Sequence, residues 1–128
     1  MKVVITGAES SGKTTLFDSL EKCYKTKGAK EYARDFLFKS NGMYSQHDLV
    51  AIANGQISYE LAVSKQQSSL VLCDTDLLTI KIWSEYKYGS CDSRILNLLN
   101  KNSADLYLLM SPDIPWQDDP LRENPTNR

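Results

Sequence analysis

A short segment near the start of the chain has the residue types and spacing that could hold a phosphate group. Residues 7–14 read Gly-Ala-Glu-Ser-Ser-Gly-Lys-Thr and match the pattern G-x-x-x-x-G-K-[ST] at every fixed position. The two glycines let the backbone turn where a Cβ would clash, so that successive N–H groups can point at phosphate oxygens. By chance such a pattern arises about once in 10⁴ positions, so it predicts a nucleotide-binding P-loop.

Each part of this loop has an expected role. Lys13 would reach the β- and γ-phosphates, the Thr14 hydroxyl would bind Mg²⁺, and Thr15 could reach the α-phosphate. The alternative is a Gly-Ser turn with an incidental lysine. We expect ATP and Mg²⁺ as cofactors, with the nucleotide bound by Gly7, Glu9, Ser10, Ser11, Gly12, Lys13, Thr14 and Thr15.

Two acids follow a later apolar run and could complete the metal site. Residues 69–73 predict a buried strand that ends in Asp74-Thr75-Asp76. Asp74 is expected to hold Mg²⁺ directly or through water, and Asp76 lies where ligands of open α/β sheets bind. The alternative is that these acids only cap the helix that starts at Leu77.

The loop and the acids require a sheet with helices to position them. Strands are predicted at 3–5, 69–73 and 106–110, and Glu31-Tyr32-Ala33-Arg34 is expected to end another short strand. Helices are predicted at 13–24, from a cap at Ser45 to about Lys65, and at 77–86 and 93–101. This alternation predicts an α/β P-loop NTPase fold, a parallel sheet with helices on both faces.

The last part of the chain differs in character. Four prolines between Ser111 and Arg128 predict a loop, which we expect to act as a lid. The strand at 106–110 would leave an apolar sheet edge, so we expect the chain to lack a last strand and helix that its natural parent has.

Length and charge limit the possible classes of protein. The 128 residues predict a single kinase-like domain spanning 1–128, and 15 basic against 16 acidic residues leave no broad basic face for nucleic acid. The three cysteines are expected to be reduced thiols of a cytoplasmic protein. No segment approaches the roughly 20 apolar residues of a membrane span, and the sequence leaves the oligomeric state open.

Four blocks of the chain carry a resemblance to a known family. They are 7–16 (Gly-Ala-Glu-Ser-Ser-Gly-Lys-Thr-Thr-Leu), 31–34 (Glu-Tyr-Ala-Arg), 74–76 (Asp-Thr-Asp) and 112–116 (Pro-Asp-Ile-Pro-Trp). In this order they resemble the ribosylnicotinamide kinase domain of NadR-type NAD-biosynthesis proteins, and related stand-alone bacterial kinases of NAD metabolism are similar. The resemblance covers nearly the whole chain, and the P-loop alone would not single out this family.

The resemblance implies transfer of the ATP γ-phosphate to the 5′-hydroxyl of nicotinamide riboside, a small-molecule partner. It implies phosphate binding by 7–15, Mg²⁺ binding by Thr14 and Asp74, and a mobile lid around 118–128. The adenylyltransferase and DNA-binding domains of the family and the closing segment of its kinase domain are absent from this sequence, so their activities are not carried over. The implied riboside contacts are Glu31, Arg34, Asp76 and Trp116.

Several residues keep two interpretations. Lys13, Mg²⁺ and Arg122 or Arg128 would neutralise the transferred phosphate. Both arginines could instead be ordinary solvated side chains, which is the favoured interpretation for Arg128. Glu31 could orient or deprotonate the acceptor hydroxyl, or simply pair with Arg34. Trp116 could stack on a flat cationic ring or pack its loop down. His47 is expected at a cap or the surface, and Trp83, Tyr86 and Tyr88 in the core and rim.

The functional alternatives also stay open. The leading interpretation is a kinase for nicotinamide riboside, followed by a kinase for another nucleoside or small alcohol. A third interpretation is a nucleotide-dependent switch or partner-binding ATPase. The proline-rich lid with its tryptophan favours a kinase, because lids exclude water from the transferred phosphate.

Overall fold

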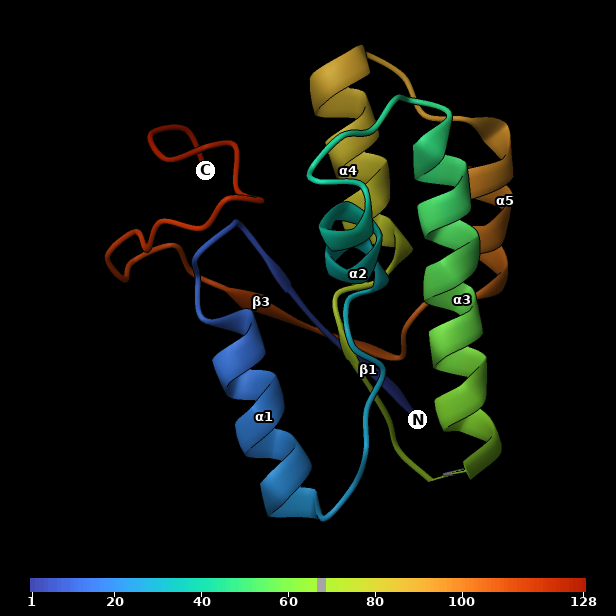
Figure 1. The fold of residues 1–128 in the computed structure, drawn as a ribbon. Coiled ribbons are helices and arrows are strands. Elements are labelled where there is room, and N and C mark those ends of the chain that lie inside the picture. The colour runs from blue at the N-terminus through green and yellow to red at the C-terminus, as the bar shows by residue number, and fades with distance from the viewer. Residues whose placement is uncertain (67–68) are drawn as a thin grey trace.

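The computed structural model describes residues 1–66 and 69–128, and within these residues three parallel strands form one sheet (Figure 1). The strands are β1 (Lys2–Gly7), β2 (Val71–Asp74) and β3 (Leu106–Met110), in the order β2-β1-β3. Val4 of the central strand pairs with Cys73 on one side and Tyr107 on the other. The parallel sheet expected from the sequence is therefore confirmed.

Helices cover both faces of this sheet because β1 is apolar on both sides. Val3 and Ile5 face α1 (Lys13–Tyr24), whose Phe17 is buried against them. Val4 faces the other way, toward Tyr59 and Val63 of α3 (Asp48–Gln66). A larger core packs the remaining helices against α3. These helices are α2 (Tyr32–Lys39), α4 (Leu77–Tyr88) and α5 (Ser93–Lys101).

The expectation that residues 31–34 end a strand is wrong. Before them, Ala29 makes an isolated parallel bridge to Cys73, with its N–H 2.8 Å from the carbonyl of Leu72. Glu31 then takes the N-cap position of α2. Ala33 and Leu37 are spaced one helical turn apart and bury the same face of α2, so packing against α3 favours helix over strand.

The capping contacts expected at Ser45 are present, and α3 itself begins three residues later, at Asp48. The N–H of Ser45 donates to Asp48 Oδ2 at 2.8 Å, and the N–H of Asp48 lies 3.4 Å from Ser45 Oγ. These reciprocal contacts satisfy N–H groups that the helix itself cannot pair. His47 lies exposed at this turn, as expected.

Residues 111–128, here called the tail, form a loop as predicted, and they lie beyond the N-terminal end of α1 (Figure 1). The strand before the tail is an exposed edge, where Leu109 keeps 78% of its surface accessible. Among the described residues, none of the helices is long and apolar enough to span a membrane.

Two helix caps, one buried and one exposed, allow a test of how burial affects the contribution of a cap to stability. Asp76 caps α4 through the N–H of Leu78 at 3.0 Å, accepts the Tyr107 hydroxyl at 2.8 Å and is only 1% exposed. We predict that Asp76→Ala lowers the free energy of unfolding by about 2–3 kcal/mol, because a cap is lost and the Tyr107 hydroxyl loses its acceptor. Urea denaturation measures this.

Asp92→Ala is the matched control, since Asp92 caps α5 through the N–H of Arg94 at 2.8 Å from a more exposed position. Its expected cost is about 0.5–1 kcal/mol. Equal losses in the two variants would contradict a special role for the buried cap.

Candidate nucleotide-binding site

The loop between β1 and α1 has a backbone conformation that favours glycine at two positions. Gly7 has φ 140°, and a Cβ placed there would lie 2.7 Å from the carbonyl oxygen of Met110 in β3. Gly12 has φ 87° at the N-cap of α1, and Ser10 between them also has a positive φ, of 55°. The chain thus turns sharply at the carboxyl edge of the sheet, as an anion-binding loop requires.

The N-terminus of α1 leaves donors free for a ligand. The first intrahelical bond runs from the N–H of Leu16 to the carbonyl of Gly12, at 3.0 Å. The N–H groups of Lys13, Thr14 and Thr15 therefore have no intrahelical acceptor and add to the positive end of the helix dipole.

Lys13 lies across the mouth of the loop. Its Nζ donates to the carbonyl oxygens of Gly7 at 2.9 Å and Ala8 at 2.6 Å. Desolvation lowers the pKa of Lys13, while the negative charges of Glu31 and Asp74 act in the opposite direction. The ammonium group is thus held by weak neutral acceptors, which phosphate oxygens can replace.

Thr14 and Asp74 meet at the amino end of α1. Alternation along β2 turns Asp74 toward the α1 face of the sheet, and the Thr14 hydroxyl donates to Asp74 Oδ2 at 2.8 Å. Within residues 1–66 and 69–128, no partner lies within hydrogen-bonding reach of the buried Asp74 Oδ1. Burial raises the pKa of Asp74, and Thr14 and Lys13 oppose this. A buried carboxylate oxygen without a partner beside a hydroxyl fits a hard divalent cation.

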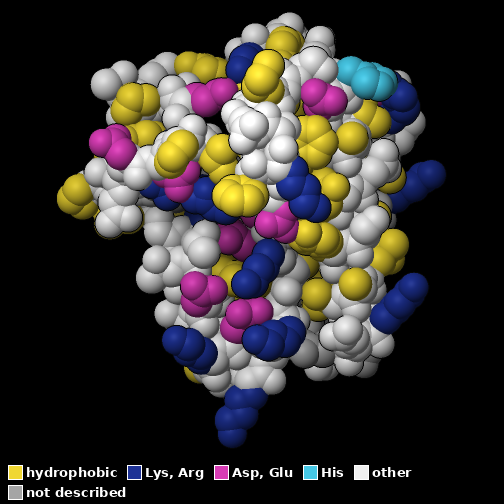
Figure 2. Space-filling view, viewed as in Figure 1, with side chains coloured by type: hydrophobic (Ala, Val, Ile, Leu, Met, Phe, Trp, Pro, Cys, Tyr) yellow, Lys and Arg dark blue, Asp and Glu magenta, His cyan; other side chains and the backbone are white. Residues whose placement is uncertain are grey.

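A cavity of about 760 Å³ opens from this loop toward α2, α4 and the tail. Where the tail meets α2, basic, acidic and hydrophobic side chains lie next to one another on the surface (Figure 2). Besides the loop itself, the cavity lining includes Glu31, Arg34, Tyr44, Thr79, Trp83, Tyr86, Arg122 and Arg128.

Glu31 is the acid of this cavity with the most perturbed pKa. Burial first, and then the charge of Asp74, raise the pKa of Glu31 to about 7, against the opposing charges of Lys13 and Arg34. A carboxyl group with a pKa near neutral, in the same cavity as Lys13, is suited to exchange a proton with a bound hydroxyl.

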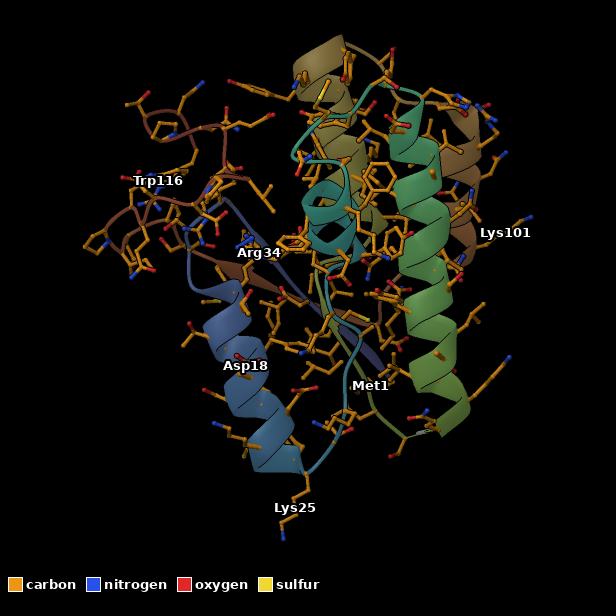
Figure 3. All side chains as sticks on the ribbon, viewed as in Figure 1. Met1, Asp18, Lys25, Arg34, Lys101 and Trp116 are labelled. Carbon is orange, nitrogen blue, oxygen red and sulfur yellow. The ribbon has the colours of Figure 1, made fainter. Side chains whose placement is uncertain are left out.

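The other three residues expected to bind substrate lie differently. Arg34, labelled in Figure 3, lines the cavity. It forms an ion pair with Asp119 of the tail. Asp76 is not part of the lining, because Thr75 turns the chain with φ 64° and Asp76 is buried at the start of α4. Trp116 is also outside the lining. The centroid of its ring lies 5.8 Å from the guanidinium carbon of Arg122 and 5.6 Å from that of Arg128.

The structure adds an aromatic wall that the sequence analysis assigned to core and rim. Tyr44 and Trp83 meet edge to face with ring centroids 4.7 Å apart, and Trp83 Nε1 donates to the Tyr44 hydroxyl at 3.0 Å. With Tyr86 they line the cavity on the side of α4. Thr79, Trp83 and Tyr86 recur at helical spacing, so the sequence could have predicted that they share one face of a helix. It could not show that this face of α4 borders the P-loop.

The parallel sheet, the glycine-bounded loop and the free N–H groups of α1 define the class of P-loop nucleotide-binding proteins. A family model described as "AAA domain" matches residues 2–128, so the chain belongs to this family.

Curated relatives also support the resemblance seen in the sequence. The "Trifunctional NAD biosynthesis/regulator protein NadR" of Salmonella typhimurium is 32% identical over 126 residues, covering 94% of this chain and 30% of that protein. The protein of the same name from Escherichia coli K12 gives the same identity and coverage. The chain thus spans about 30% of the length of these relatives.

Solved structures agree on the fold. A NadR protein in complex with NR superposes with a TM-score of 0.72 at 21% identity, covering 84% of this chain and 32% of that one. Thymidylate kinase from Ehrlichia chaffeensis superposes with a TM-score of 0.62 at 23% identity, covering 87% and 71% of the respective chains. The P-loop kinase fold is therefore confirmed.

The pKa of Glu31 leads to a prediction about stability. Because its pKa rises from 4.5 to about 7 on folding, the folded protein retains a proton that the unfolded chain releases. The contribution of this retained proton to the free energy of unfolding is largest below pH 4.5 and is lost as pH rises through 7. We predict that Glu31→Gln removes this fall, so that the variant gains stability relative to wild type between pH 5 and 8.

Denaturant titrations at several pH values measure this difference. Glu85→Gln is the control, since Glu85 forms an exposed pair with Lys81 within α4. A constant difference between Glu31→Gln and wild type across this pH range would show that Glu31 does not retain its proton on folding.

Proposed function

We propose that this chain is an ATP-dependent kinase that transfers the γ-phosphate to the 5′-hydroxyl of nicotinamide riboside. One observation carries the proposal: a single cavity is lined by the phosphate loop, by Glu31 with its raised pKa, and by the aromatic side chains of the α4 side. The 32% identity to NadR proteins of NAD biosynthesis supports the choice of acceptor.

The donor half of the reaction would use the loop. The N–H groups at the start of α1 and the Lys13 ammonium group bind the phosphates and neutralise charge that develops on the transferred group. Thr14 and Asp74 would hold Mg²⁺, which supplies further charge neutralisation when bound. Arg122, on the cavity wall formed by the tail, would add another positive charge to the phosphate-binding part of the cavity.

The acceptor half would lie between Glu31 and α4. Glu31 would accept the proton of the attacking hydroxyl, for which a pKa of about 7 is suitable. The π-faces of Trp83 and Tyr86 on the cavity wall would attract a flat cationic nicotinamide ring.

Three further residues complete the proposed acceptor site. Arg34 would contact the riboside after leaving Asp119, and Asp76 would act by holding the start of α4 in place. Trp116 would reach the substrate only if the tail, acting as a lid, moved it away from the two arginines.

A second candidate is a kinase for another nucleoside or nucleotide, which the fold shared with thymidylate kinase favours. Measuring ADP release by the full-length protein with ATP, Mg²⁺ and a panel of ribosides separates these candidates. We predict that nicotinamide riboside raises ADP release well above the acceptor-free rate, and that Lys13→Ala lowers this rate by about 10²-fold or more.

Stimulation by a different nucleoside alone would overturn the assigned acceptor. Rapid ADP release that no acceptor changes would instead indicate a nucleotide-dependent switch or ATPase.

The proposed metal site gives a separate prediction. Asp74→Asn keeps an oxygen for Thr14 but removes the charge, so we predict about 10- to 100-fold weaker activation by Mg²⁺. ATP binding without metal should change far less, and titration calorimetry in EDTA checks this. Equal losses in both measurements would exclude a metal role for Asp74.

A further inference from the structure

A carboxylate within an anion-binding loop is electrostatically unfavourable, and Glu9 occupies such a position in the P-loop. Glu9 instead receives hydrogen bonds from the tail. Its Oε1 accepts the N–H of Glu123 at 3.1 Å, and its Oε2 accepts the N–H and the side-chain Nδ2 of Asn124 at 3.0 and 3.1 Å. The carboxylate is thus satisfied by three donors from a segment more than 100 residues away in the sequence.

Ser10, the next residue of the loop, provides a second attachment. Its Oγ accepts the N–H of Gln117 at 2.9 Å and lies 3.5 Å from Arg122 Nη1. Its carbonyl oxygen accepts from Arg128 Nη1 at 2.8 Å. Two successive residues of the phosphate loop therefore hold the tail along most of its second half.

Arg122 lies between these attachments, one residue before Glu123 and five after Gln117. Its guanidinium group donates to the Gln117 carbonyl and faces the same cavity as Lys13. Arg122 and Lys13 therefore present two positive charges to one cavity. The position of Arg122 therefore depends on how the tail is attached to the loop.

Contacts on the far side of the cavity are weaker candidates for this attachment. Arg34 pairs with Asp119, and Glu123 contacts Lys87 at 3.3 Å. Both pairs are partly exposed, and exposed ion pairs are screened by water and salt. Charge-assisted hydrogen bonds from main-chain N–H groups to one carboxylate are stronger and more directional.

We propose that Glu9 is a positioning residue, which clamps residues 123 and 124 onto the phosphate loop and so holds Arg122 in the cavity that Lys13 also lines. This role in turnover rests on the kinase function proposed above. In this proposal the role of Glu9 differs from that of the rest of the loop: the neighbouring residues bind phosphate, while Glu9 keeps the guanidinium group of Arg122 in place.

Charge alone predicts the opposite outcome for substitution of Glu9. Removing a negative charge from an anion site should strengthen nucleotide binding. Losing the clamp should instead release Arg122 and slow phosphoryl transfer. Glu9→Ala is therefore expected to lower kcat by about 10-fold or more while leaving the affinity for ATP unchanged or higher.

Hydrogen exchange tests the clamp without reference to activity. In Glu9→Ala we expect the N–H groups of Glu123 and Asn124 to exchange about tenfold faster, with β1 unchanged. Glu9→Gln has the same shape and guards against a folding defect; it keeps one acceptor oxygen, so an intermediate effect is expected. Asp18→Asn, on the exposed side of α1, is the matched control for loss of charge. Unchanged exchange at both positions would overturn the clamp.

A double-mutant cycle with Arg122→Ala tests the consequence for turnover. If Glu9 acts through Arg122, adding Glu9→Ala to Arg122→Ala should lower kcat by less than about twofold. Independent, multiplicative losses would overturn the positioning role. If the wild-type protein phosphorylates no acceptor, the proposed function fails, and the same cycle is then judged on dissociation of a non-hydrolysable ATP analogue together with the exchange data.

Discussion

The contact between Gly7 and β3 is the constraint on which the rest of the site depends. The backbone passes so close to the Met110 carbonyl that a side chain at position 7 would overlap it, with a Cβ only 2.7 Å away. This close passage ends β1 and turns the chain toward α1, whose Phe17 is buried against Val3 and Ile5. Because the strand, the turn and the helix are each fixed by packing, the free N–H groups at the start of α1 are aimed before a ligand arrives.

The carboxyl groups around this loop balance its positive charge. Asp74 and Glu31 are both shifted toward the protonated form by burial, and both lie within electrostatic reach of Lys13. In the proposed kinase, the protonation of these two groups would follow the charge of the bound phosphates and divalent cation. Among the residues that the structure describes, no group donates a hydrogen bond to the buried Asp74 Oδ1, so this oxygen is available to a ligand.

The cavity is assembled from segments that lie far apart in the chain. The loop at 7–15 forms one side and the aromatic face of α4 another, while the tail closes over both with Arg122 and Arg128. Arg128 donates to main-chain carbonyls of Glu9 and Ser10, which agrees better with pinning the tail than with a freely solvated side chain. In the proposed kinase, such a closing segment would also exclude water from the transferred phosphate.

The sequence by itself determined the P-loop, the strands of the parallel sheet and most helix bounds, because these follow from local patterns: glycines at fixed spacing, β-branched runs and helical periodicity. It also singled out Asp74, since an acid after a buried strand reaches the edge where parallel strands end. Only the tertiary structure decided that residues 32–34 belong to a helix, that Asp76 turns away to cap α4, and that Trp83 and Tyr86 face the cavity. These outcomes depend on contacts between distant segments, such as α2 with α3, and local sequence does not encode which face of a helix meets a neighbour until the chain has packed.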